Sequence, residues 1–127
     1  MKGIFHPGDI RTFSKKVLRE DCAAFNGQMV HPLYSTFALA RDAEWCCRLF
    51  VLDMKEDDEE GIGTFIQIEH LAPAPVNAAV DFTAVIEEIK GNEIICSFQV
   101  QKDTIIIARG KQKQKVLKKE RLERLYH

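Results

Sequence analysis

Residues 35–54 read STFALARDAEWCCRLFVLDM, and this stretch decides the fold. Ser35 and Thr36 each offer a side-chain oxygen that can cap a helix, so a helix is predicted from there to about Met54. Residues at helical spacing give it one apolar face; they are Leu39, Ala43, Cys46, Cys47 and Phe50, with Trp45 and Val51 widening the face. One amphipathic helix cannot bury such a face alone, so we expect a sheet to cover it.

The sequence on both sides of this helix is mainly typical of β-strands. Residues 9–22 suggest a first strand, and residues 25–34 mix turn formers with apolar residues, as a segment folded over a cleft would. After the helix, Gly61 and Gly63 predict a turn, and Pro73 and Pro75 predict a break between strands. Alternation of period two predicts four strands, over residues 64–70, 80–87, 94–100 and 104–116.

These elements predict an α+β fold, in which an antiparallel sheet of about five strands wraps around one long central helix. The last four strands are sequential, so we expect them to pair as a meander. No repeat or linker interrupts the sequence, which therefore predicts a single domain over residues 1–127.

The composition narrows the class of protein. Of the 127 residues, 46% are hydrophobic and 29% are charged, which is usual for a globular chain. No apolar run has the length of a membrane span or of a secretory signal, so we expect a soluble cytoplasmic protein. The four cysteines lack the spacing of a zinc site or a disulfide framework; they are Cys22, Cys46, Cys47 and Cys96. We therefore expect no metal.

The carboxyl-terminal part of the chain is basic, although the net charge is only −1. Residues 109–124 hold eight Lys or Arg and two Asp or Glu, but no aromatic residues alternate with them, so nucleic-acid binding is not expected. Lys111, Lys113 and Lys115 share one strand face. They either attract the phosphates of a ligand or protect an exposed strand.

Three polar side chains stand at a spacing that suits acyl-transfer chemistry. Thr36 supplies a hydroxyl, Glu44 a carboxylate eight positions on, and His70 an imidazole at the end of an apolar strand. Gly63 lets the backbone approach a ligand closely. Each side chain also has a purely structural explanation, because Thr36 can cap the helix, Glu44 can pair with a neighbouring arginine, and His70 can be a core residue.

The pattern resembles a known family. Residues 35–36, the pair Glu44-Trp45, residues 61–64 (GIGT) and residues 70–75 (HLAPAP) are similar to the hot-dog-fold thioesterases of the fluoroacetyl-CoA thioesterase type, over roughly residues 30–116. The resemblance implies a hot-dog fold and a catalytic set of Thr36, Glu44 and His70, with Gly63 lining the substrate site.

Other positions match the family or depart from it. Gly91 and Gly110 match glycines in a turn and on the last strand. Gln114 stands where the family has an arginine, and Arg41 and Asp42 stand where its members carry mainly apolar or small residues.

The resemblance implies an acyl-CoA thioesterase that hydrolyses a small acyl thioester. Glu44 would attack the carbonyl or activate a water, His70 would serve as acid and base, and Thr36 would donate a hydrogen bond. No cofactor is implied, because coenzyme A is part of the substrate. The family also implies a homodimer or a dimer of dimers, with clefts at the subunit interface. The alternative is a non-catalytic acyl-CoA-binding hot-dog module, which Gln114 and the Arg41-Asp42 pair favour.

Overall fold

The computed structural model describes residues 1–126, which form seven strands, two α-helices and one short 3-10 helix. In chain order these are β1 (Ile10–Lys16), η1 (Arg19–Asp21), β2 (Cys22–Phe25), β3 (Gln28–Tyr34), α1 (Thr36–Met54), β4 (Glu59–His70), β5 (Ala79–Lys90), β6 (Glu93–Lys102), β7 (Ile105–Lys118) and α2 (Lys119–Glu123). Within this part of the chain, no helix has the length and apolar character needed to cross a bilayer.

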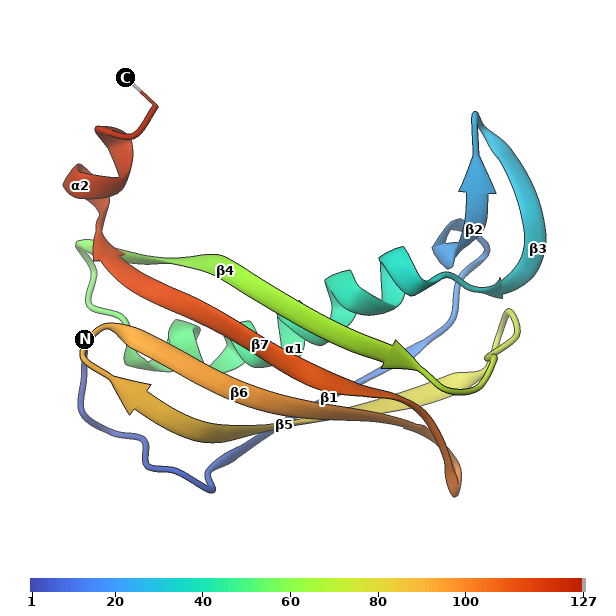
Figure 1. The fold of residues 1–127 in the computed structure, drawn as a ribbon, viewed down its shortest axis with the longest axis horizontal. Coiled ribbons are helices and arrows are strands. Elements are labelled where there is room, and N and C mark those ends of the chain that lie inside the picture. Colours follow the sequence, from blue (N-terminus) through green and yellow to red (C-terminus); the bar gives the residue numbers. More distant parts are fainter. Residues whose placement is uncertain (127) are drawn as a thin grey trace.

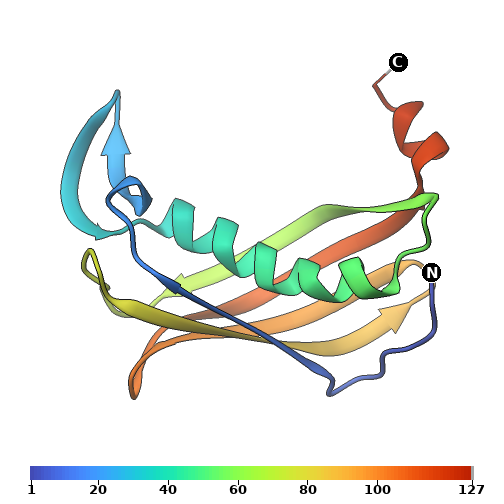
Figure 2. The ribbon, with the colours of Figure 1, turned by 180° about the vertical axis from the view of Figure 1, so that it is seen from behind.

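Five strands make one antiparallel sheet in the order β1-β5-β6-β7-β4, and α1 lies against one of its faces (Figure 1). Seen from behind, α1 crosses in front of the sheet (Figure 2). The hairpin of β2 and β3 stands beyond the sheet, next to the first turn of α1, and α2 lies at the opposite end of the molecule (Figures 1 and 2). The predicted antiparallel sheet around one long helix is confirmed.

The predicted meander is wrong for one strand. β4 pairs with β7 instead of its successor β5, so it forms an edge of the sheet. Residues 71–78 carry the chain from that edge back toward the other side, where β5 pairs with β1. Alternation of apolar and polar residues within a strand indicates which face is buried, but it does not indicate which other strand pairs with it. The lysines of β7 therefore lie on a strand that has neighbours on both sides, and they do not protect an edge of the sheet.

Helix α1 begins and ends as predicted. Ser35 is the N-cap, and its Oγ accepts a hydrogen bond from the Ala38 N–H at 3.0 Å. The predicted apolar residues are buried apart from Trp45, which is 42% exposed. The prediction that Trp45 widens the apolar face was wrong. At 100° per residue, position 45 points away from the side of the helix that Ala43 and Cys47 share.

The inner face of the sheet supplies the other half of the core. Two sets of alternating residues are buried against α1: Val80, Phe82, Ala84 and Ile86 on β5, and Ile94, Cys96, Phe98 and Val100 on β6. All four cysteines are free and buried, as expected for small apolar residues. The faces predicted for these two strands are confirmed.

The predicted glycine turn after α1 is wrong, because Gly61 and Gly63 lie inside β4 and face the helix. A Cβ at Gly61 would lie 2.8 Å from Val51 Cγ1, and a Cβ at Gly63 would lie 2.1 Å from Glu44 Oε1. These glycines therefore let the helix and the edge strand approach each other closely, and neither needs an unusual backbone angle to do so.

Candidate functional site

Thr36 and His70 meet where the first residue of α1 faces the last residue of β4. The Thr36 Oγ1 lies 2.9 Å from His70 Nδ1. Because Ser35 supplies the helix cap, the Thr36 hydroxyl is free for this contact. The structural explanation of Thr36 as the cap is therefore wrong.

His70 is half-buried at the end of β4. Burial lowers the pKa of His70 from its ordinary value, although a hydrogen bond with the Ala72 backbone acts in the opposite sense. Its Nε2 is enclosed and has no hydrogen-bond partner within residues 1–126. One ring nitrogen of His70 thus contacts a hydroxyl, whereas the other is buried without a partner.

A cavity of about 830 Å³ opens beside this pair. Its walls come from the β2–β3 hairpin, the first turns of α1 and the loop after β4. Three exposed apolar side chains line it: Phe25 at 73% exposure, Phe37 at 84% and Leu71 at 48%. The cavity is lined mainly by apolar residues, as is common for small-molecule sites, and its polar lining residues include Thr36, His70, His31 and Arg41.

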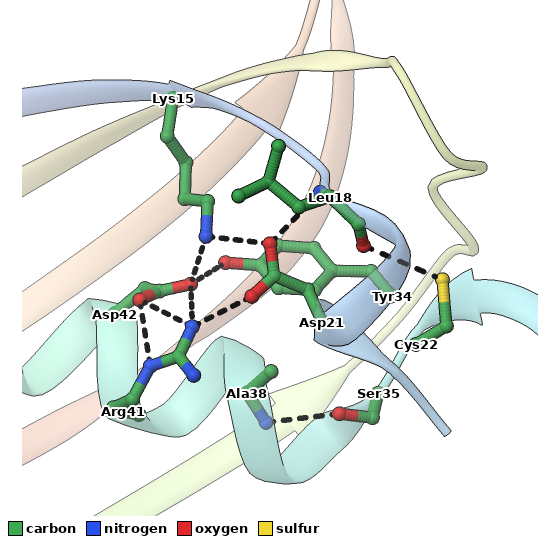
Figure 3. Close-up of polar contacts among 9 residues, drawn as sticks. All are labelled: Lys15, Leu18, Asp21, Cys22, Tyr34, Ser35, Ala38, Arg41 and Asp42. Atoms are coloured by element: carbon green, nitrogen blue, oxygen red, sulfur yellow. Dashed lines mark hydrogen bonds and ion pairs between the residues drawn. The ribbon is translucent and has the colours of Figure 1, made fainter. Parts of the chain in front are cut away.

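A partly buried polar network joins this hairpin to the helix (Figure 3). Asp21 accepts hydrogen bonds from Lys15 Nζ at 2.7 Å and from Arg41 Nη2 at 2.8 Å. Asp42 accepts from the same two cations and from the Tyr34 hydroxyl. The five residues come from β1, η1, β3 and α1, so the network holds one wall of the cavity against the helix.

The protonation states in the network follow from these contacts. Burial alone would raise the pKa of Asp21, but hydrogen bonds from Lys15 and Arg41 outweigh it, and the pKa lies below its ordinary value. Burial, together with the neighbouring Asp42, raises the pKa of Tyr34. Arg41 and Asp42, the residues that depart from the family pattern, thus belong to an ion-pair network that supports the cavity wall.

Glu44 and Gly63 form a second cluster. The Glu44 side chain is half-buried, and its Oε1 occupies the space where a Gly63 side chain would be. The neighbouring arginines do not pair with it, since Arg41 contacts Asp21 and Asp42, and Arg48 contacts Glu60 at 2.8 Å. The carboxylate is therefore held over bare strand backbone.

The structure brings Thr36 to His70 and Glu44 to Gly63, but it does not join the two pairs within one chain. Thr36 and Glu44 are eight residues apart on α1, a rise of about 12 Å. The residues that line the 830 Å³ cavity include Thr36 and His70 and do not include Glu44 or Gly63.

Sequence reasoning missed Gln112, which lies in the second cluster. Its Nε2 would be 3.6 Å from a Cβ at Gly63, and the residue is 1% exposed. The sequence does hold a signal for it, because Gln112 alternates with Lys111 and Lys113. If the two lysines are exposed, Gln112 is a polar residue on the buried face of the strand.

Comparisons with known proteins identify a family that matches most of this chain and solved structures with the same fold. A family model described as "Fluoroacetyl-CoA-specific thioesterase" matches residues 17–120. A hypothetical protein from Thermus thermophilus, a thioesterase superfamily member, is 28% identical with a TM-score of 0.91, and 95% of this chain and 90% of that chain are covered. No curated protein matches the chain.

Two more distant solved structures show the same fold. A hot-dog-like protein from Thermanaerovibrio acidaminovorans is 22% identical with a TM-score of 0.88, over 95% of this chain and 90% of that chain. A mutant of the fluoroacetyl-CoA-specific thioesterase FlK, in complex with fluoroacetate and CoA, is 18% identical with a TM-score of 0.86. The match covers 93% of this chain and 99% of that chain. The predicted hot-dog fold is confirmed.

Proposed function

Because the chain belongs to the fluoroacetyl-CoA-specific thioesterase family, we propose that it is an acyl-CoA thioesterase that hydrolyses a small acyl thioester. Family membership makes it a thioester hydrolase; the acyl-CoA substrate and the catalytic residues are our proposal. The single observation that carries them is the contact of Thr36 Oγ1 with His70 Nδ1 beside a mainly apolar cavity. The reaction needs no cofactor, since coenzyme A enters as part of the substrate.

A second copy of the chain would complete the site. β4 is an edge strand and carries exposed apolar residues: Ile62 at 36%, Phe65 at 45% and Ile66 at 38%. Such an edge favours pairing with another strand. We therefore propose a homodimer in which the two β4 strands pair in an antiparallel manner.

The register of this pairing follows from the positions of the site residues. Two copies of one strand that pair in an antiparallel manner about a two-fold axis set one residue opposite its own copy. With Gln67 at that axis, and with the irregularity that the register of β4 shows between Gly63 and Phe65, His70 lies opposite residues 63–64 of the partner subunit, at a Cα separation of about 5 Å. Glu44 of one subunit, which lies over Gly63, then approaches the Thr36–His70 pair of the other. Each dimer would hold two composite sites.

In such a site the roles of the three residues follow from their chemistry. Glu44 takes a proton from water while the water oxygen bonds to the thioester carbonyl carbon. Alternatively, Glu44 attacks that carbon itself, and water then hydrolyses the anhydride that forms. The carbon–sulfur bond breaks, and the departing sulfur receives through His70 the proton that the water releases, so that both residues return to their starting states. Thr36 holds the imidazole through Nδ1; when its hydroxyl donates to that nitrogen, the ring hydrogen is on Nε2. The products are the free acid and the coenzyme A thiol.

Thiol release from a panel of short acyl-CoAs tests this proposal. Wild-type turnover is expected, and Glu44→Gln and His70→Ala should each lower kcat by about a hundredfold or more, the range for general acid or base groups. Unchanged turnover in both variants would remove the assignment. Tight acyl-CoA binding without thiol release would instead support the non-catalytic module, which the separation of the two residue pairs within one chain favours.

A further inference from the structure

Arg41 is a charged residue on the wall of the cavity that also contains Thr36 and His70. It lies on α1, five residues after Thr36, which is a rise of about 7.5 Å along the helix. Its side chain is 53% exposed, so a molecule in the cavity can reach it. The cavity therefore has a cation close to the point where the Thr36 hydroxyl meets the His70 imidazole.

The network around Asp21 uses only part of the hydrogen-bonding capacity of Arg41. Its Nη2 donates to Asp21 at 2.8 Å and to Asp42 at 3.1 Å, and its Nε donates to Asp42 at 3.0 Å (Figure 3). Within residues 1–126, no hydrogen bond involves the third nitrogen, Nη1. A guanidinium has five N–H donors in a rigid plane, and two of them are on Nη1. Arg41 is thus held by one edge and has two donors left for a ligand.

The charges next to Arg41 leave it able to bind an anion. Lys15 contacts the same two carboxylates, Asp21 at 2.7 Å and Asp42 at 3.0 Å, so two cations face two anions in the network. Glu20 also lines the cavity, but it is exposed to water on η1, which weakens its repulsion of a bound anion. The guanidinium is therefore not neutralised by an excess of carboxylates.

We propose that Arg41 is a specificity residue whose Nη1 binds a carboxylate at the far end of the acyl group, so that the preferred substrates are thioesters of short dicarboxylic acids. This rests on the proposed thioesterase function. The phosphates of coenzyme A lie beyond the long pantetheine arm, whereas Arg41 is about one and a half helical turns from Thr36. An anion that reaches Arg41 while the thioester lies at Thr36 and His70 therefore belongs to the acyl group. Charge-assisted hydrogen bonds to such a carboxylate are stronger than bonds between neutral groups.

The experiment compares succinyl-CoA with butyryl-CoA, whose acyl groups both have four carbons and differ in the terminal carboxylate. The readout is the ratio of the two kcat/KM values, measured by thiol release with the uncatalysed rate subtracted. For the wild type we expect succinyl-CoA to be favoured about tenfold, the effect of a hydrogen bond to a charged group. For Arg41→Met we expect the ratio to fall close to one. Damage to the fold or to the polar network affects both substrates and cancels in this ratio.

Arg48→Met is the matched control, because Arg48 is on the same helix, pairs with Glu60 at 2.8 Å and is not among the residues that line the cavity. Its ratio should equal that of the wild type. A ratio in Arg41→Met within twofold of the wild-type ratio would overturn the role of Arg41, since the residue would then act on the shared coenzyme A part or only on the fold.

The wild type alone also tests the inference, whether or not the Arg41 variant folds. A wild-type ratio below threefold would overturn the preference for dicarboxylic acyl groups and leave the thioesterase function in place. A wild-type protein that releases no thiol from any short acyl-CoA would overturn both proposals together.

Discussion

At the scale of single residues, Gly63 matters for the space that it leaves. A Cβ at this position would fall 2.1 Å from Glu44 Oε1, the far end of a flexible side chain that can turn aside. We expect Gly63→Ala to displace the carboxylate and lower kcat/KM for acyl-CoA hydrolysis by tenfold or more, while unfolding free energy changes by less than about 1 kcal/mol. Thiol-release kinetics and urea denaturation measure the two effects.

Gly61 provides the matched control for this substitution. Its Cβ would lie 2.8 Å from Val51 Cγ1, which belongs to the packed core. Overpacking of a core costs about 1–3 kcal/mol, so Gly61→Ala should destabilise the fold and leave the kcat/KM of the folded protein nearly unchanged. The opposite pattern, with activity lost at position 61 and kept at position 63, would contradict the placement of Glu44.

At the scale of elements, the network around Asp21 fastens the β2–β3 hairpin to α1. Asp21→Asn removes the charge that faces Lys15 and Arg41, and breaking a buried ion pair should lower the unfolding free energy by about 3 kcal/mol. The contribution is present above pH 3.8, the ordinary pKa of Asp21, and is lost as the pH falls through its lower folded value. Urea denaturation of both proteins at neutral pH and in acid checks this.

The control for that prediction is Asp53→Asn, because Asp53 pairs with Arg11 at 3.0 Å on the surface and is 53% exposed. Exposed pairs contribute little, so a much smaller change is expected. Equal losses in the two variants would mean that the Asp21 network gains nothing from its burial.

The elements also show what the sequence could predict. Helix α1 and the buried faces of β5 and β6 were predictable, because capping and periodicity are local signals. The place of β4 beside β7 was not, since pairing depends on partners far along the chain. The same limit applies to the site, because the contact between Glu44 and Gly63 depends on how α1 packs against β4, which no local pattern indicates.

At the scale of the whole molecule, the composite site predicts complementation between two inactive chains. In a mixed dimer of Glu44→Gln and His70→Ala, one site receives both substituted residues and the other receives intact Glu44 and intact His70. Random mixing makes half of the dimers mixed, each with one working site, so activity should recover to about a quarter of the wild-type value. A site contained within one chain would recover nothing. Thiol release after co-refolding the two variants, with dimer exchange verified by mass, distinguishes these outcomes.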